Sequence, residues 1–195
     1  MNVSNIVRSA FLGGALAFGG CAVERSVREL HQQGVQYSID EVLQAYISEI
    51  KPLYVNPDPS VALNNMSENR DVIFELMRVY FSNVDEQSVE SADASQRQML
   101  AAAYGDYCVA TMLVRGRQSV DGAILLLERA IELDPNNSSL YFNYANLLWL
   151  DESRPESERS SLVLRALDNC LRLDPSNVNA QTAKANLEQY LREHR

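Results

Sequence analysis

The side chains best suited to chemistry are three cysteines and two histidines, and their spacing is the first test of function. They are Cys21, Cys108, Cys170, His31 and His194. No two cysteines form a Cys-x-x-Cys pair and the histidines are far apart, so the spacing of a zinc site is missing. The sequence also has no Ser/His/Asp order and no phosphate-binding glycine loop. We therefore expect no enzyme activity, no metal and no cofactor.

Cys21 ends an apolar stretch, and this position suits a different chemistry, the attachment of a lipid. Arg8 is the only charged side chain before Glu24, and residues 9–21 are apolar or small. A helix that spans a bilayer needs about 20 apolar residues, so this stretch is too short. It has the length of the apolar part of a secretory signal.

Two glycines directly before Cys21 complete a pattern that resembles the bacterial lipoprotein signal. The resemblance implies that residues 1–20 are removed and that Cys21 carries lipid. Phe18 departs from the Leu, Val or Ile that is usual there. Ala22 is not the aspartate associated with inner-membrane retention, so the resemblance implies an outer-membrane protein that faces the periplasm. A buried apolar first helix, which four glycines disfavour, and an uncleaved membrane anchor are the alternatives.

Residues 21–97 have the pattern of a helical region interrupted by two long loops. Ser38 and Glu41 form a capping box that predicts the start of one helix. Apolar residues at helical spacing predict another. The expected order is a helix over 22–33, a helix from Ser38 to Pro52, a loop over 53–66, a helix over 70–81 and a loop over 82–94.

Two segments of the second half of the chain are near copies. Residues 127–137 read LERAIELDPNN, and residues 167–177 read LDNCLRLDPSN. Each predicts a helix end closed by Leu-Asp-Pro, with the proline at the start of the next helix, where its missing N–H costs nothing. Pro135 and Pro175 are 40 residues apart, so the segment behaves as a repeat.

This pattern resembles the tetratricopeptide repeat family, whose helix pairs recur every 34 residues. An insertion over 151–159, at the turn between two helices, accounts for the longer period. Thr111 in place of glycine and Ser160 in place of an aromatic residue depart from the family pattern. The likeness rests on two sets of residues at the signature spacing: Tyr107, Ala110, Thr111, Val114, Val120, Ala123, Leu127, Ala130 and Pro135, then Tyr141, Tyr144, Ala145, Leu148, Ser160, Val163, Leu167, Cys170 and Pro175.

The resemblance implies an all-α fold, a solenoid of helix-turn-helix repeats. Residues 98–195 would hold two repeats and a closing helix over 177–194, and residues 21–97 would form an irregular helical cap. The family binds partners on the concave surface lined by the first helix of each repeat. Carried over residue by residue, this surface holds Cys108, Met112, Arg115, Phe142, Asn146, Trp149, Asn179, Thr182 and Asn186.

Phe142 and Trp149 are two helical turns apart with Asn146 between them, which predicts a seat for a peptide. The alternative is that these aromatic residues pack against the N-terminal cap. Arg115 is the only cation of the set, so the family's basic clamp for C-terminal carboxylates is not reproduced. Cys170 has the position of a small buried residue, and a disulfide to Cys108 is the less favoured alternative.

The composition narrows the class of partner. Hydrophobic residues make up 46% of the chain, enough for a packed core, and the net charge is −9 without any basic cluster. An acidic surface of this kind is unsuited to nucleic acid. The sequence predicts a lipid-anchored adaptor or scaffold in the bacterial cell envelope with a protein or peptide partner. Two alternatives remain: an accessory subunit of an envelope transport system that helps deliver a small ligand, and a soluble cytosolic adaptor.

Overall fold

The computed structural model describes residues 36–194, which divide into two compact units. The first unit ends at Ala103 and the second begins at Tyr104. The predicted signal segment, Cys21 and the predicted helix over 22–33 lie outside the described residues. Within residues 36–194 the regular elements are helices, and the β-type pairing is limited to one isolated bridge between Tyr37 and Val84. The predicted all-α fold class is therefore confirmed. In this part of the chain, no helix combines the length and apolar character that crossing a membrane requires.

The first helix of this unit among the described residues is α3 (Ile39–Ala45), and the predicted capping box is present. The Ser38 hydroxyl accepts from the backbone N–H of Glu41 at 3.4 Å, and the Glu41 carboxylate accepts from the backbone N–H of Ser38 at 2.9 Å. The chain continues as a wider π-helical turn (Tyr46–Ile50) and a 3₁₀ turn (Lys51–Leu53). Because the π turn changes the register, Ile50 is buried, whereas Ile47, predicted on the same apolar face, is 47% exposed.

The predicted loop over 53–66 is wrong in its second half. Helix α4 (Pro59–Glu68) occupies this stretch. Asp58 caps it by accepting from the backbone N–H of Ser60 at 2.8 Å, and Pro59 is its first residue. Since the first N–H of a helix has no partner within the helix, proline fits this position. Proline is common both in loops and at helix starts, and Pro59 is a helix start.

The predicted loop over 82–94 also contains a helix, the short α6 (Glu86–Glu90). The Asp85 carboxylate accepts from the backbone N–H groups of Gln87 and Ser88 at 3.3 and 3.1 Å. The acidic residues of this stretch therefore include a helix cap, which a polar composition alone does not distinguish from a loop. Helix α5 (Arg70–Phe81) lies as predicted, and its apolar face is buried.

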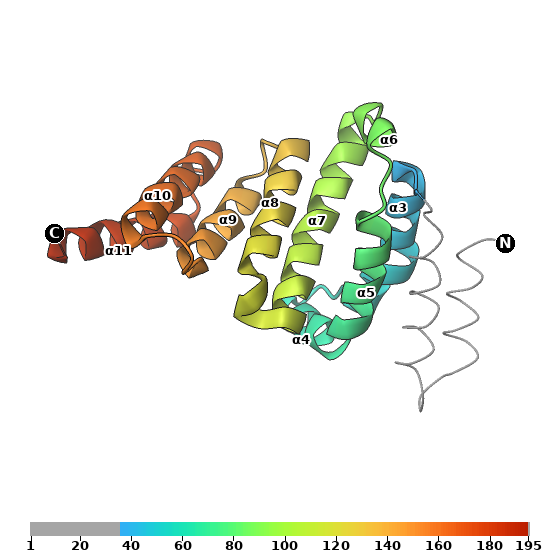
Figure 1. Cartoon of the computed structure of the whole chain (residues 1–195), viewed down its shortest axis with the longest axis horizontal. Coiled ribbons are helices and arrows are strands. Elements are labelled where there is room, and N and C mark those ends of the chain that lie inside the picture. The colour runs from blue at the N-terminus through green and yellow to red at the C-terminus, as the bar shows by residue number, and fades with distance from the viewer. Residues whose placement is uncertain (1–35, 195) are drawn as a thin grey trace. The chain divides into compact units, whose positions relative to one another are not determined.

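The second unit contains the end of α7 (Ala94–Arg115), a 3₁₀ turn (Gly116–Ser119) and the helices α8 (Val120–Leu133), α9 (Ser138–Leu150), α10 (Glu156–Leu173) and α11 (Val178–Glu193). Helices α8 to α11 pack in chain order, each against the next (Figure 1). Equivalent positions of the two predicted repeats are buried alike, with Ala130 in α8 and Cys170 in α10 both fully buried.

The predicted Leu-Asp-Pro helix ends are confirmed, whereas the predicted role of the prolines is wrong. Helix α8 ends at Leu133 and α10 ends at Leu173. The prolines lie in the turns, ahead of the next helix. That helix is capped by Asn137 in one repeat and by Asn177 in the other, whose side chains accept backbone N–H groups at 3.2 and 3.0 Å. An asparagine side chain has an oxygen that accepts from a free backbone N–H in the first turn of the helix, and a proline side chain has no such acceptor.

The insertion predicted over 151–159 is part turn and part helix, because α10 begins at Glu156 and has 18 residues against 14 in α8. Asp151, only 2% exposed, anchors the turn. Its carboxylate accepts from the Ser153 backbone N–H at 3.1 Å, from the Ser153 hydroxyl, and from Arg154 Nε at 2.6 Å. Hydrogen bonds from Ser153, and then the Arg154 guanidinium, hold the pKa of Asp151 below its usual value.

The two departures from the family pattern differ in their consequences. The buried Thr111 hydroxyl donates to the backbone carbonyl of Tyr107 at 2.8 Å, so the helix itself satisfies it. Ser160 is also buried, but its hydroxyl has no hydrogen-bond partner among the described residues. A buried hydroxyl without a partner costs about 1–3 kcal/mol, so the second repeat carries the less favourable substitution.

Candidate partner-binding pocket

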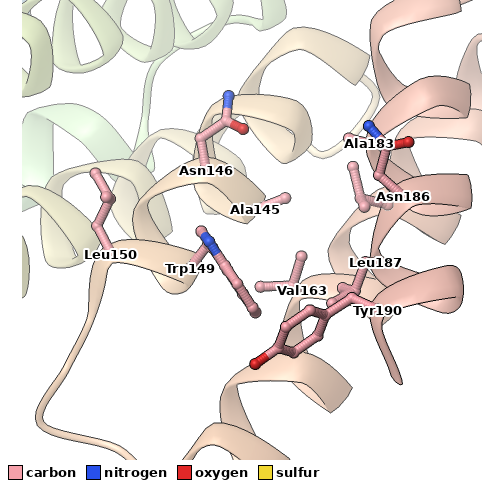
Figure 2. A pocket seen from close by; sticks show the side chains of 10 residues that line it. Ala145, Asn146, Trp149, Leu150, Val163, Ala183, Asn186, Leu187 and Tyr190 are labelled. Atoms are coloured by element: carbon pink, nitrogen blue, oxygen red, sulfur yellow. The ribbon is translucent and has the colours of Figure 1, made fainter. Parts of the chain in front are cut away.

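A cavity of about 480 Å³ lies within the second unit, between α9, α10 and α11 (Figure 2). Its floor is apolar and comes from α10 and α11, with Val163, Leu167 and Leu187. Two alanines, Ala145 on α9 and Ala183 on α11, leave the walls open. Small residues at facing positions of neighbouring helices leave a space between their larger neighbours.

Three residues of the predicted groove line this cavity: Asn146 and Trp149 from α9, and Asn186 from α11. Asn146 and Asn186 are 40 residues apart in the sequence, the same separation as the two repeat prolines, so they are equivalent positions. Both are exposed, and neither side-chain amide has a hydrogen-bond partner in the part of the chain that the structure describes. The structure thus places two solvent-exposed amides on different helices of one pocket, and neither is committed to a partner among the described residues.

The other six predicted residues do not line the pocket. Phe142 is half-buried on α9, and Asn179 and Thr182 are exposed on α11. The remaining three belong to α7, where Cys108 is buried, Met112 half-buried and Arg115 exposed. That any of these nine residues contacts a partner stays a prediction.

Trp149 forms one end of the pocket together with Tyr190 of α11. The two rings meet edge to face, with centroids 6.0 Å apart at 84° (Figure 2). The Arg159 guanidinium lies 5.4 Å from the Trp149 ring centroid, and its Nη1 donates to the Trp149 carbonyl at 3.2 Å. Trp149 nevertheless remains 38% exposed, so part of its ring is free to contact a ligand.

Tyr190 was not among the predicted site residues, although a signal for it was present. It follows Leu187 by three residues on the inward face of the closing helix, so helical spacing places it beside that face. Its ring also stacks on His194, with centroids 4.2 Å apart. A hydrogen bond to Glu156 of α10, and then burial, raise the pKa of the Tyr190 hydroxyl. This bond and the Lys184–Asp168 ion pair at 2.6 Å tie α11 to α10.

Cys108 and Cys170 are both free thiols, so the disulfide considered from the sequence is not formed. Burial raises the pKa of Cys108 to about 12. Burial, followed by the charge of Asp174, also raises the pKa of Cys170. Both act as small apolar residues. No cluster of three or more His, Cys, Asp or Glu side chains suited to a metal occurs within residues 36–194.

The sequence profile of the tetratricopeptide repeat family matches residues 126–155. This span covers the second half of α8, all of α9 and the turn that follows, so it includes four pocket residues, Ala145, Asn146, Trp149 and Leu150. No curated protein matches the chain. A repeat of this kind indicates a role in protein interaction, as an adaptor or scaffold, and such proteins are generally not catalysts.

Proposed function

We propose that this protein is a lipid-anchored adaptor of the bacterial cell envelope that holds a protein partner in the pocket between α9 and α11. One observation carries the proposal: the pocket opens on the matched repeat and displays a partly exposed tryptophan beside two exposed amides. Tryptophan is enriched among the residues that dominate binding at protein interfaces. The anchor rests on the lipoprotein-like pattern that ends at Cys21.

Trp149→Ala tests the binding surface. We expect partner capture from solubilised envelopes to weaken by about 30-fold, which corresponds to about 2 kcal/mol, while the helical circular dichroism stays nearly unchanged. Leu125→Ala is the matched control, because Leu125 is an apolar side chain that is 65% exposed on α8, away from the pocket. Full capture by folded Trp149→Ala protein would move the binding surface elsewhere. Unfolding of this variant would show that Trp149 is part of the core.

Metabolic labelling with a fatty-acid analogue tests the anchor. The wild-type chain should take up label and fractionate with the outer membrane, whereas Cys21→Ser should do neither. Cys170→Ser is the control for a general effect of losing a cysteine, since that thiol is fully buried. Equal labelling of the wild type and Cys21→Ser would contradict the anchor without bearing on the pocket.

The volume of the pocket favours a second candidate function, the delivery of a small ligand within an envelope transport system. About 480 Å³ is within the range of small-molecule sites, which span about 300–1,000 Å³. Mass spectrometry of extracts from the purified protein distinguishes the two candidates. A stoichiometric small molecule lost in Trp149→Ala supports delivery, and its absence together with a Trp149-dependent protein partner supports the adaptor.

A further inference from the structure

We infer that Arg159 receives an acidic side chain of the partner, at the edge of the pocket where its guanidinium lies over the Trp149 ring. This inference rests on the proposed function and names one chemical group that the partner must present. It follows from three features of Arg159: the absence of a carboxylate beside it, a buried N–H without an acceptor, and its contact with a tryptophan that lines the pocket.

Arg159 is a half-buried cation without a carboxylate partner in the part of the chain that the structure describes. The acidic residues next to it in the sequence are already engaged. Glu156 accepts from the Tyr190 hydroxyl, and Glu158 pairs with Arg154 at 3.0 Å. The chain has 26 acidic residues against 17 basic ones, so carboxylates are not in short supply. Because a half-buried charge without a counterion is unfavourable, Arg159 favours an anion from outside the chain.

The hydrogen bonds of the guanidinium show which of its edges remains for a ligand. Nη1 of Arg159 donates to the Trp149 carbonyl at 3.2 Å, which ties one side of the group to α9. Nε is buried, and it has no hydrogen-bond acceptor among the described residues. The tryptophan ring is a weaker partner for the positive charge than a carboxylate. A carboxylate on the Nε edge would therefore supply the missing acceptor and a counterion together.

Trp149 connects this edge to the pocket. Its ring lines the cavity beside Tyr190, remains partly exposed and has its centroid 5.4 Å from the Arg159 guanidinium (Figure 2). A turn of the Trp149 or Arg159 side chain opens the Nε edge, and side-chain changes of this kind are common when proteins bind. The acidic group of the partner therefore stands next to the residue that enters the apolar cavity.

The charges around the pocket select a carboxylate over other anions. Among the described residues, those that line the cavity are uncharged, so a single guanidinium faces the ligand at this edge. One carboxylate balances that charge. A phosphate group carries about 1.5–2 negative charges, and the net charge of −9 opposes the excess. The structure therefore fits a partner with an aspartate or glutamate beside an apolar residue.

The test uses the full chain in detergent micelles and two peptides of five residues, blocked at both ends. Each has a central leucine, preceded by aspartate in one peptide and by asparagine in the other, with serine elsewhere. Trp149 is the only tryptophan, so its emission reports binding at this edge. The aspartate peptide should bind about tenfold more tightly, because hydrogen bonds between charged groups are stronger than those to a neutral amide. Added salt should reduce this preference.

Variants on α10 assign the preference to one arginine. Arg159→Gln should abolish it, because glutamine keeps a donor and loses the charge. Arg159→Lys should keep part of it, since an ammonium group retains the charge without the planar fork. Arg165→Gln is the matched control, because it removes an exposed arginine of the same helix outside the pocket lining and should leave the preference unchanged. Circular dichroism should show all three variants folded.

An equal response of the wild-type emission to the two peptides, including no response to either, would overturn the inference. So would an aspartate preference that persists in folded Arg159→Gln protein. Partner capture from solubilised envelopes that depends on Trp149 and not on Arg159 would also overturn it, and would leave the proposed function standing. Capture that depends on neither residue would reject the inference and the proposed function together.

Discussion

Ala130→Leu tests whether the two repeats are aligned as the structure places them. Ala130 is fully buried in α8, at the position that fully buried Cys170 holds in α10. Leucine adds three carbon atoms where no space is available, so α8 must shift or the side chain must leave its preferred rotamer. Overpacking of this kind costs about 1–3 kcal/mol. With a urea dependence of about 2 kcal/mol per molar, the unfolding midpoint falls by about 0.5–1.5 M urea.

Urea unfolding followed by Trp149 fluorescence measures this effect in the second unit, because α9, which carries the only tryptophan, packs directly against α8. Ala130→Cys is the first control, since it introduces the residue that the equivalent position already holds, and its midpoint should change far less. Leu125→Ala is the second, as an exposed change on the same helix that should stay within about 0.5 kcal/mol. An unchanged midpoint for Ala130→Leu would refute the alignment of the repeats.

Gly122→Ala should stabilise the second unit by about 0.5–1 kcal/mol, because Gly122 is exposed on α8 and the added Cβ meets no atom within 4 Å. A lower urea midpoint would contradict this. Cys108 should resist a thiol reagent at about pH 8 in the folded chain and react once urea is added, since burial raises its pKa to about 12. Mass spectrometry of its peptide reads this out, and rapid native labelling would show the thiol to be accessible. Asp151→Asn should destabilise near neutral pH, because hydrogen bonds from Ser153 lower the pKa of the Asp151 carboxyl and so stabilise its charged form. This stabilisation is present above the unfolded pKa of about 3.9 and is lost as the pH falls below it, so the gap in urea midpoint between wild type and variant should close toward about pH 2; a gap independent of pH would exclude the charge as the cause.

Features that depend on neighbours within about four residues were predictable from the sequence. The capping box of Ser38 and Glu41, the helix over 70–81 and the helix ends at Leu133 and Leu173 all lie where the local pattern placed them. Each depends on a side chain that reaches its own backbone or on apolar spacing along one helix, and both are properties of a short segment.

Local signals failed where one residue type serves two purposes. Pro59 and Asp85 were interpreted as loop residues, and they begin α4 and cap α6. Proline and aspartate are common both at helix starts and in loops. Which structure forms depends on whether the residues that follow gain enough burial to stay helical. The π turn over Tyr46–Ile50 has the same origin, because packing and not local spacing decides which of Ile47 and Ile50 is buried.

The candidate site shows the same division. The sequence by itself determined that Asn146 and Trp149 share one face of a helix and that Asn186 is the repeat equivalent of Asn146, since both follow from spacing along the chain. Only the tertiary structure decided that these three residues, out of nine candidates, line one pocket, and that Tyr190 closes its end. A pocket is the space left between separate helices, and its presence depends on how α9, α10 and α11 pack, which no single segment encodes.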